Sequence, residues 1–226
     1  MITKRRHLLK ALLALSIVPH TVLAKLSEPE LQSWEQFITA MRQLSRQHQS
    51  DKWIAERGMM LMKLLDVQSK DFAREVANAW ESGNRFWFWQ RLSREPGLLG
   101  GVLSIEKGQD IPMHDHPGAT GIVRILEGQA EVWQYDVVDR SDPSGHVILK
   151  RHLYRRLKPG DTAALLPNEG NIHTLRASTA ECRMLDYFIP PYQRLERKWY
   201  TPISHQWSEK DTVRCKETPE QEFETT

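Results

Sequence analysis

The sequence predicts a mainly β protein, in which a closed or double-sheet β body follows an N-terminal helical segment. Up to Gly83, apolar residues recur at intervals of three and four, the period of a helix. After Gly83 they form short or alternating runs separated by Gly, Pro, Asp and Asn, which is typical of strands and turns. A chain of 226 residues, 40% hydrophobic and 27% charged, can bury one substantial core. We expect a signal peptide over 1–24, a helical region over 25–83, a barrel domain over 84–207 and a polar flexible tail over 208–226.

The first 24 residues have the layout of a signal peptide. A basic head precedes an apolar run over 11–18 and a small-residue end at Ala24, where we expect cleavage. The paired Arg5 and Arg6 resemble a twin-arginine export signal, which predicts a periplasmic protein. A cytoplasmic protein or an uncleaved membrane anchor is the alternative. The apolar run is shorter than the roughly 20 residues that a span needs, so we expect no stable membrane span in the mature chain.

The charge balance argues against nucleic acid and anionic membrane surfaces as partners. The full chain has a formal net charge of +2, and loss of the signal peptide removes basic residues but no acidic ones. Two cysteines, Cys182 and Cys215, allow one disulfide but not a disulfide scaffold. We further expect a monomer.

Three helices are predicted before Gly83. The first spans about 27–46 with Ser27 as its N-cap, the second spans about 51–65, and the third spans about 69–83. Methionine and tryptophan at helical spacing are typical of packing contacts rather than of cofactor contacts.

Eight apolar or alternating runs predict the strands of the β body. They are 86–89, 101–105, 121–126, 130–138, 146–157, 162–166, 172–176 and 183–189. From Ser208 onward the chain is polar and poor in aromatic residues, and this composition predicts the mobile tail.

The stretch IPMHDHPGAT, residues 111–120, carries two histidines one residue apart. Residues i and i+2 of a strand project to one face, so His114 and His116 can present two imidazoles to one interior. With Gly108, Gly121 and Gly128, the spacing resembles the first cupin motif, G-x5-H-x-H-x4-E-x6-G. Gly121 stands where that motif has its metal-binding glutamate.

A second block resembles the second cupin motif and supplies a third histidine. Gly160 is followed by Pro167, Gly170 and His173, with one extra residue on each side of the proline. The two resemblances imply a single cupin barrel, which is a double-stranded β-helix or jelly roll. Three neutral imidazoles would leave a divalent metal its full charge, which favours an anionic ligand such as a thiolate. The ligand set suits iron(II) with open positions but also zinc with a reactive water.

Three longer segments resemble the thiol dioxygenases of the cysteamine dioxygenase and plant cysteine oxidase family. They are IPMHDHPGATGIVRILEG, LPNEGNIHTL and LDYFIPPY, which lie within residues 100–192. The resemblance implies Fe(2+) on His114, His116 and His173. It also implies oxidation of a small thiol or an N-terminal cysteine by O2 to a sulfinic acid. Asp186 matches the family's acidic residue near the substrate, and Tyr192 matches the tyrosine of its P-P-Y ending.

Several alternatives remain open from the residues themselves. Asp186 lies in an apolar run, where a carboxylate is either paired structurally or placed for binding and proton transfer. Tyr192 is either a packed ring or part of the site. Arg124 and Arg176 are either carboxylate-binding groups or solvated or paired surface charges. Asp115 should point away from the metal by strand alternation, or else it orients one of the imidazoles. The rival functions are an exported metal-binding cupin without dioxygenase activity and a zinc or manganese cupin enzyme.

Overall fold

The computed structural model describes residues 30–78, 80–83, 87–192 and 196–223. The predicted signal peptide and the expected N-cap Ser27 lie outside the described residues. Among the described residues, no helix is both long and apolar enough to cross a membrane.

Three helices precede the sheets: α2 (Trp34–Leu44), α3 (Asp51–Leu64) and α4 (Lys70–Asn78). Ser33 caps α2 in a capping box with Gln36, and Ser50 caps α3 through its side chain. The third helix is shorter than the sequence predicts, because α4 ends at Asn78 and the next segment pairs as a strand.

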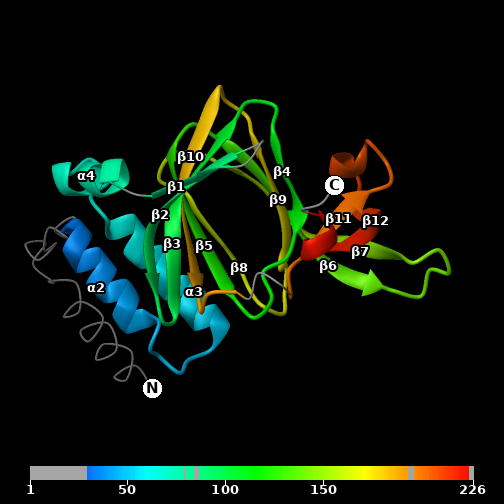
Figure 1. Ribbon diagram of the computed structural model, residues 1–226, viewed down its shortest axis with the longest axis horizontal. Helices are drawn as coiled ribbons and strands as arrows, with labels where there is room; N and C mark the ends of the chain where they lie inside the picture. The colour runs from blue at the N-terminus through cyan, green and yellow to red at the C-terminus, as the bar shows by residue number, and fades with distance from the viewer. Residues whose placement is uncertain (1–29, 79, 84–86, 193–195, 224–226) are drawn as a thin grey trace, which may run out of the picture. The chain divides into compact units, whose positions relative to one another are not determined.

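Twelve strands form two antiparallel sheets in the described part of the chain (Figure 1). In order of pairing, the first sheet contains β1 (Trp80–Gly83), β2 (Trp87–Glu95), β3 (Leu98–Glu106), β10 (Glu181–Ile189), β5 (Thr120–Glu127) and β8 (Thr162–Leu165). The second contains β11 (Lys198–Pro202), β12 (Thr212–Pro219), β7 (His146–Leu157), β6 (Ala130–Asp139), β9 (Ile172–Ala177) and β4 (Asp110–His114), and it closes on itself through β11 and β4.

The two sheets confirm the predicted jelly roll. Strands β3-β10-β5-β8 and β4-β9-β6-β7 are two four-stranded layers, which is the arrangement of a double-stranded β-helix. Apolar side chains from both layers share one core cluster, with Ile125 and Met184 from the first sheet and Val132 and Leu175 from the second. The barrel interior is therefore a packed space between the layers.

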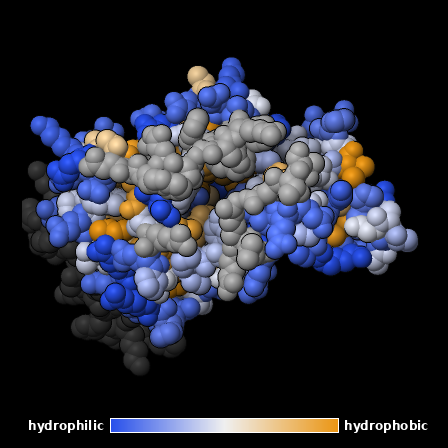
Figure 2. Space-filling view, in the orientation of Figure 1, coloured by the Kyte–Doolittle hydropathy of each residue, from blue (hydrophilic) through white to orange (hydrophobic). Residues whose placement is uncertain are grey.

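Two further cores flank this interior. The helices pack on the first sheet, where Phe37 and Met41 of α2 join Ile122 and Tyr187 of the strands. On the second sheet, the residues that point out of the jelly roll pack against the C-terminal strands, as Tyr135 does with Val213. The visible described surface in Figure 2 is mainly hydrophilic, with hydrophobic residues scattered between polar ones.

The polar end of the chain differs from the predicted mobile tail. Residues 212–219 form β12, which pairs with both β7 and β11, and Glu220–Phe223 form the short helix α5. A 3₁₀ turn over Trp207–Glu209 precedes them. The composition did not indicate this strand, because most of its side chains are polar. Only Val213 and Cys215 are buried, and they alternate with exposed polar residues.

Candidate metal centre

Two neighbouring strands bring the three predicted histidines together. His114 ends β4 and pairs directly with His173 of β9, and His116 follows two residues after the end of β4. A register shift between Ile111 and His114 lets the end of β4 depart from regular alternation. All three side chains are buried, with exposed fractions of 5%, 3% and 8% for His114, His116 and His173.

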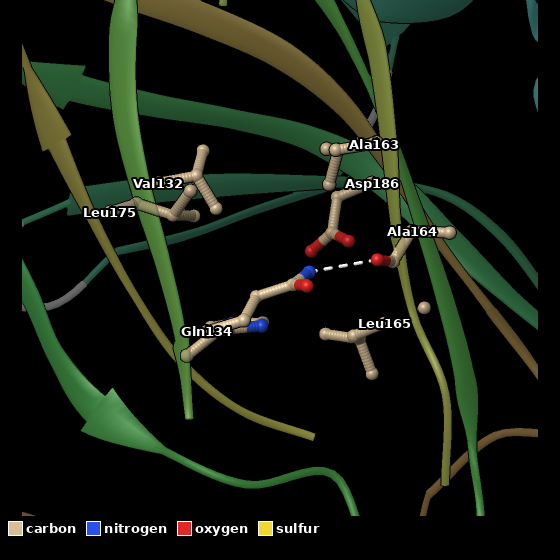
Figure 3. Close-up of a pocket in the computed structure, with 10 residues that line it drawn as sticks. Val132, Gln134, Ala163, Ala164, Leu165, Leu175 and Asp186 are labelled. Atoms are coloured by element: carbon tan, nitrogen blue, oxygen red, sulfur yellow. Dashed lines mark hydrogen bonds between the residues drawn. The ribbon is translucent and has the colours of Figure 1, made fainter. Parts of the chain in front are cut away.

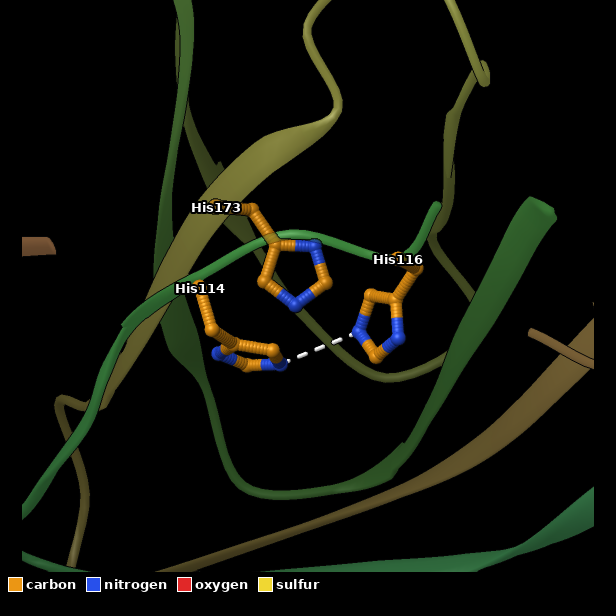
Figure 4. Close-up of side chains that lie close together, drawn as sticks. All are labelled: His114, His116 and His173. Atoms are coloured by element: carbon orange, nitrogen blue, oxygen red, sulfur yellow. Dashed lines mark hydrogen bonds between the residues drawn. The ribbon is translucent and has the colours of Figure 1, made fainter. Parts of the chain in front are cut away.

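The three imidazoles converge on one point (Figure 4). Their candidate ligand nitrogens all lie within 4.8 Å of one another, and the Nε2 atoms of His114 and His116 are 3.0 Å apart. Nδ1 of His114 is 2.7 Å from the carbonyl oxygen of Pro112. A proton on Nδ1 would be donated to that carbonyl, which leaves the Nε2 lone pair free to bind a metal.

Burial keeps all three imidazoles neutral at neutral pH. Burial lowers the pKa of His114 and of His116 well below 6.5, and neighbouring histidines and Arg197 lower both further. Burial and then Arg197 lower the pKa of His173 to about 4. Neutral imidazole is the form that binds iron or zinc, so the donor set fits a divalent metal. Nδ1 of His116 is buried and has no hydrogen-bond partner among the described residues, whereas Nε2 of the same ring faces Nε2 of His114.

Gly121 leaves the site without a fourth protein ligand from β5. A Cβ atom at this position would lie 2.8 Å from Cγ of Leu165, so the space beside Gly121 is already filled by a leucine. The cluster of His114, His116 and His173 is the metal-competent group found among the described residues, and it contains no carboxylate. A bound metal would therefore keep its positive charge and its open positions.

Asp186 lies in the same cavity as His173 (Figure 3). The remaining lining is mostly apolar, and the Asp186 carboxylate points toward the side-chain amide of Gln134, which donates to the carbonyl of Ala164 at 2.7 Å. Among the described residues, no group is hydrogen-bonded to this carboxylate or forms an ion pair with it. Burial raises the pKa of Asp186 to about 7. Within the described residues, Asp186 is therefore not part of a structural ion pair. The other alternative remains, in which its carboxyl group takes up or releases a proton.

Aromatic rings surround the histidines. Tyr192 lies with its ring centroid 4.3 Å from that of His116, and Phe188 lies 4.4 Å from the same ring. Trp199 of β11 lies 4.9 Å from His114. Tyr192 is therefore packed against a candidate ligand, and Trp199 is a neighbour that the sequence did not indicate.

Two polar side chains hold the backbone around the histidines. Asn171 binds both backbone groups of His116, and its Nδ2 also donates to the carbonyl of Leu166 at 2.9 Å. Asp115 is directed at β11, where it accepts hydrogen bonds from the backbone N–H of Lys198 at 2.7 Å and from the Tyr200 hydroxyl at 3.2 Å. Sequence reasoning missed Asn171, although the GNIH segment contains it.

The two candidate arginines bind elsewhere in the fold. Arg124 donates to the carbonyls of Met62 and Leu65 at the end of α3. Arg176 forms a two-pronged ion pair with Asp110, with Nε and Nη2 donating at 2.6 and 2.8 Å. Both are structural groups.

The two cysteines do not pair. Cys182 and Cys215 are free, and they are buried in different cores. Burial raises the pKa of each thiol to about 12.

Comparisons with known proteins point to one family. The model of the PCO_ADO family matches residues 93–224. A probable 2-aminoethanethiol dioxygenase of Dictyostelium discoideum is 23% identical over 149 residues, which are 63% of this chain and 68% of that protein. Plant cysteine oxidase 2 of Arabidopsis thaliana is 37% identical over 86 residues, and human 2-aminoethanethiol dioxygenase is 26% identical over 126 residues.

The matched regions are partial. The chain spans 31% of the Arabidopsis protein and 47% of the human one, and these matches cover 36% and 46% of the chain. Among solved structures, a double-stranded β-helix protein from Klebsiella pneumoniae is 19% identical with a TM-score of 0.40, covering 51% of this chain and 87% of its own.

Proposed function

The chain belongs to the PCO_ADO family, and on that premise we propose that it is a non-haem iron(II) thiol dioxygenase. The reaction is RSH + O2 → RSO2H, in which both oxygen atoms enter the product and the thiol is oxidised to a sulfinic acid. The substrate is a small thiol, such as cysteamine or cysteine, or a peptide with an N-terminal cysteine. One observation carries the proposal: three buried, neutral imidazoles converge with no carboxylate among them.

Iron(II), when bound, would supply open coordination positions and the redox chemistry that thiol oxidation by O2 needs. His114, His116 and His173 would hold it, each through one ring nitrogen. Asp186 supplies a carboxyl group that is partly protonated near neutral pH, and it can hold the proton that the thiol gives up on binding. Tyr192 and Phe188 form an aromatic wall against His116.

Two rival functions fit the same histidines. A zinc or manganese cupin enzyme would use the three imidazoles for a metal-bound water. A metal-binding cupin without dioxygenase activity would hold a ligand and leave it unchanged. The carboxyl group of Asp186, which lines the same cavity as His173 without a polar partner among the described residues, favours a reaction over simple binding, because a half-buried carboxyl without a partner is unfavourable for the fold.

Metal analysis and a thiol panel test the proposal. The purified protein should contain iron and consume oxygen with at least one of cysteamine, cysteine, 3-mercaptopropionate and an N-terminal-cysteine peptide. His173→Ala should lose the metal and keep its fold, whereas the exposed His205→Ala should keep both. Stoichiometric zinc with no sulfinate from the panel, in iron-replete reducing buffer, would refute the dioxygenase.

We also propose that the protein is exported through the twin-arginine route, from the layout of residues 1–24. Cell fractionation of wild type and of an Arg5→Lys, Arg6→Lys double variant tests this. Export lost in the variant supports the route, and an unchanged distribution contradicts it.

A further inference from the structure

A buried carboxylate near the end of the chain binds two side chains of β11 and the segment before it. Glu220 of α5 is 1% exposed. It accepts hydrogen bonds from Nε of Arg197 at 2.7 Å, from Nη2 of Arg197, and from the indole N–H of Trp199 at 2.6 Å. The Arg197 side chain is itself only 12% exposed, so the ion pair is almost completely removed from water.

The guanidinium group of Arg197 lies against two rings that each contact a different histidine. Its central carbon is 4.5 Å from the ring centroid of Trp199 and 5.8 Å from that of Tyr192. Trp199 in turn packs on His114, and Tyr192 packs on His116. Phe223 of α5 stacks on Trp199 at 4.1 Å with an interplanar angle of 11°. The ion pair of Arg197 and Glu220 is therefore connected, through one aromatic ring each, to two of the three candidate ligands.

Stability alone is a weak reason for such a pair. Removing two charges from water costs several kcal/mol per ion, and apolar residues of similar volume often serve the fold equally well. A planar guanidinium held by two parallel hydrogen bonds fixes geometry, and it can stack on aromatic rings at the same time. The pair is thus suited to orienting its neighbours.

We propose that Glu220 and Arg197 are positioning residues of the metal centre. They fix the rings of Trp199 and Tyr192, and these rings set the orientation of the His114 and His116 imidazoles. The inference rests on the proposed metal centre, and it makes the C-terminal segment part of the site.

Cobalt(II) binding to the metal-free full-length protein tests the inference without any turnover. Affinity is measured by competition with a coloured chelator, and the visible absorption bands of bound cobalt report the ligand geometry. Glu220→Gln and Arg197→Lys should weaken cobalt binding about 10- to 100-fold and shift the bands, as loss of a partner that orients a ligand does. Trp199→Phe keeps a ring beside His114 but loses the indole N–H, and it should shift the bands in the same direction.

Glu217→Gln is the matched control. Glu217 lies in β12 and binds Lys198 at 2.7 Å and Arg140, with no ring contact to the histidines among the described residues. It should bind cobalt within about twofold of wild type. Far-UV circular dichroism at the assay temperature identifies folded variants, and Trp199→Phe decides the outcome if Glu220→Gln does not fold.

The outcomes separate two failures. If the wild type binds no cobalt, the metal centre and this inference are both wrong. If the wild type binds cobalt and folded Glu220→Gln or Trp199→Phe matches its affinity and spectrum, the inference alone is wrong.

Discussion

The side-chain amide of Asn171 forms hydrogen bonds with both the backbone N–H and the backbone carbonyl of His116. Oδ1 of Asn171 accepts from the His116 N–H at 2.7 Å, and Nδ2 donates to the His116 carbonyl at 3.2 Å. His116 lies just beyond the regular pairing of β4, so this amide replaces the strand partner that the backbone lacks there. Because Asn171 is two residues before His173, it also links the two segments that carry the candidate ligands.

Asn171→Ala should therefore affect stability and metal binding together. It leaves the buried N–H of His116 without an acceptor, which costs roughly 1–3 kcal/mol of unfolding free energy. Cobalt affinity should fall about tenfold or more, since the His116 segment is no longer fixed. Urea unfolding and chelator competition measure the two effects. The exposed Asn168→Ala is the control, and equal behaviour of the two variants would contradict the role given to Asn171.

The raised pKa of Asp186 predicts how stability depends on pH in the metal-free protein. Its pKa is about 7 in the folded chain and about 3.9 in an unfolded one, so the folded state binds the extra proton between these values. The free energy of unfolding should fall as pH rises from 4 to 7, by roughly 2–4 kcal/mol relative to Asp186→Asn. Urea unfolding at several pH values measures this. If wild type and Asp186→Asn gave parallel curves of unfolding free energy against pH, the pKa of Asp186 would not be raised. Asp71→Asn, at an exposed position, serves as the control.

Arg124 should matter for the fold and not for the metal. Its guanidinium group donates to the carbonyls of Met62 and Leu65 at the end of α3, where a helix leaves its last carbonyl groups without their regular donors four residues ahead. Arg124→Ala should lower the free energy of unfolding by about 1.5–3 kcal/mol, and cobalt affinity should stay within about twofold. The exposed Arg46→Ala should leave both values unchanged. A large loss of metal affinity in folded Arg124→Ala would place this arginine in the site after all.

Truncation distinguishes β12 from a mobile tail. A chain that ends at Asp211 loses β12 and uncovers the core that contains Tyr135, Leu149 and Tyr200. It should unfold at room temperature or aggregate, because buried apolar surface contributes about 25 cal/mol per Å². A chain that ends at Phe223 is the control. Wild-type thermal stability of the shorter chain would contradict the fold of the C-terminal segment.

The features that could be predicted are those that depend on residues close together in the sequence. The i, i+2 spacing of His114 and His116 predicted that their imidazoles lie together, and the change of period after Gly83 predicted the β body. The features that the sequence missed depend on contacts between distant segments. Val213 and Cys215 are the buried positions of a short alternating segment whose other residues are mostly polar, and two such positions do not distinguish a strand from a tail. The residues next to Glu220 in the sequence give no sign that Arg197 and Trp199 will contact and bury it. The sequence could not show that Asp186 lines a cavity together with residues of the second sheet, because those residues lie far away along the chain.

The fate of the two oxygen atoms tests the proposed reaction most directly. The iron-loaded protein is incubated with 18O2 and the thiol that supports oxygen consumption, and the product is analysed by mass spectrometry. A thiol dioxygenase should give a sulfinic acid in which both oxygens carry the label, and His173→Ala should form none. A disulfide as the sole product, or a sulfinate with one label or none, would contradict a thiol dioxygenase.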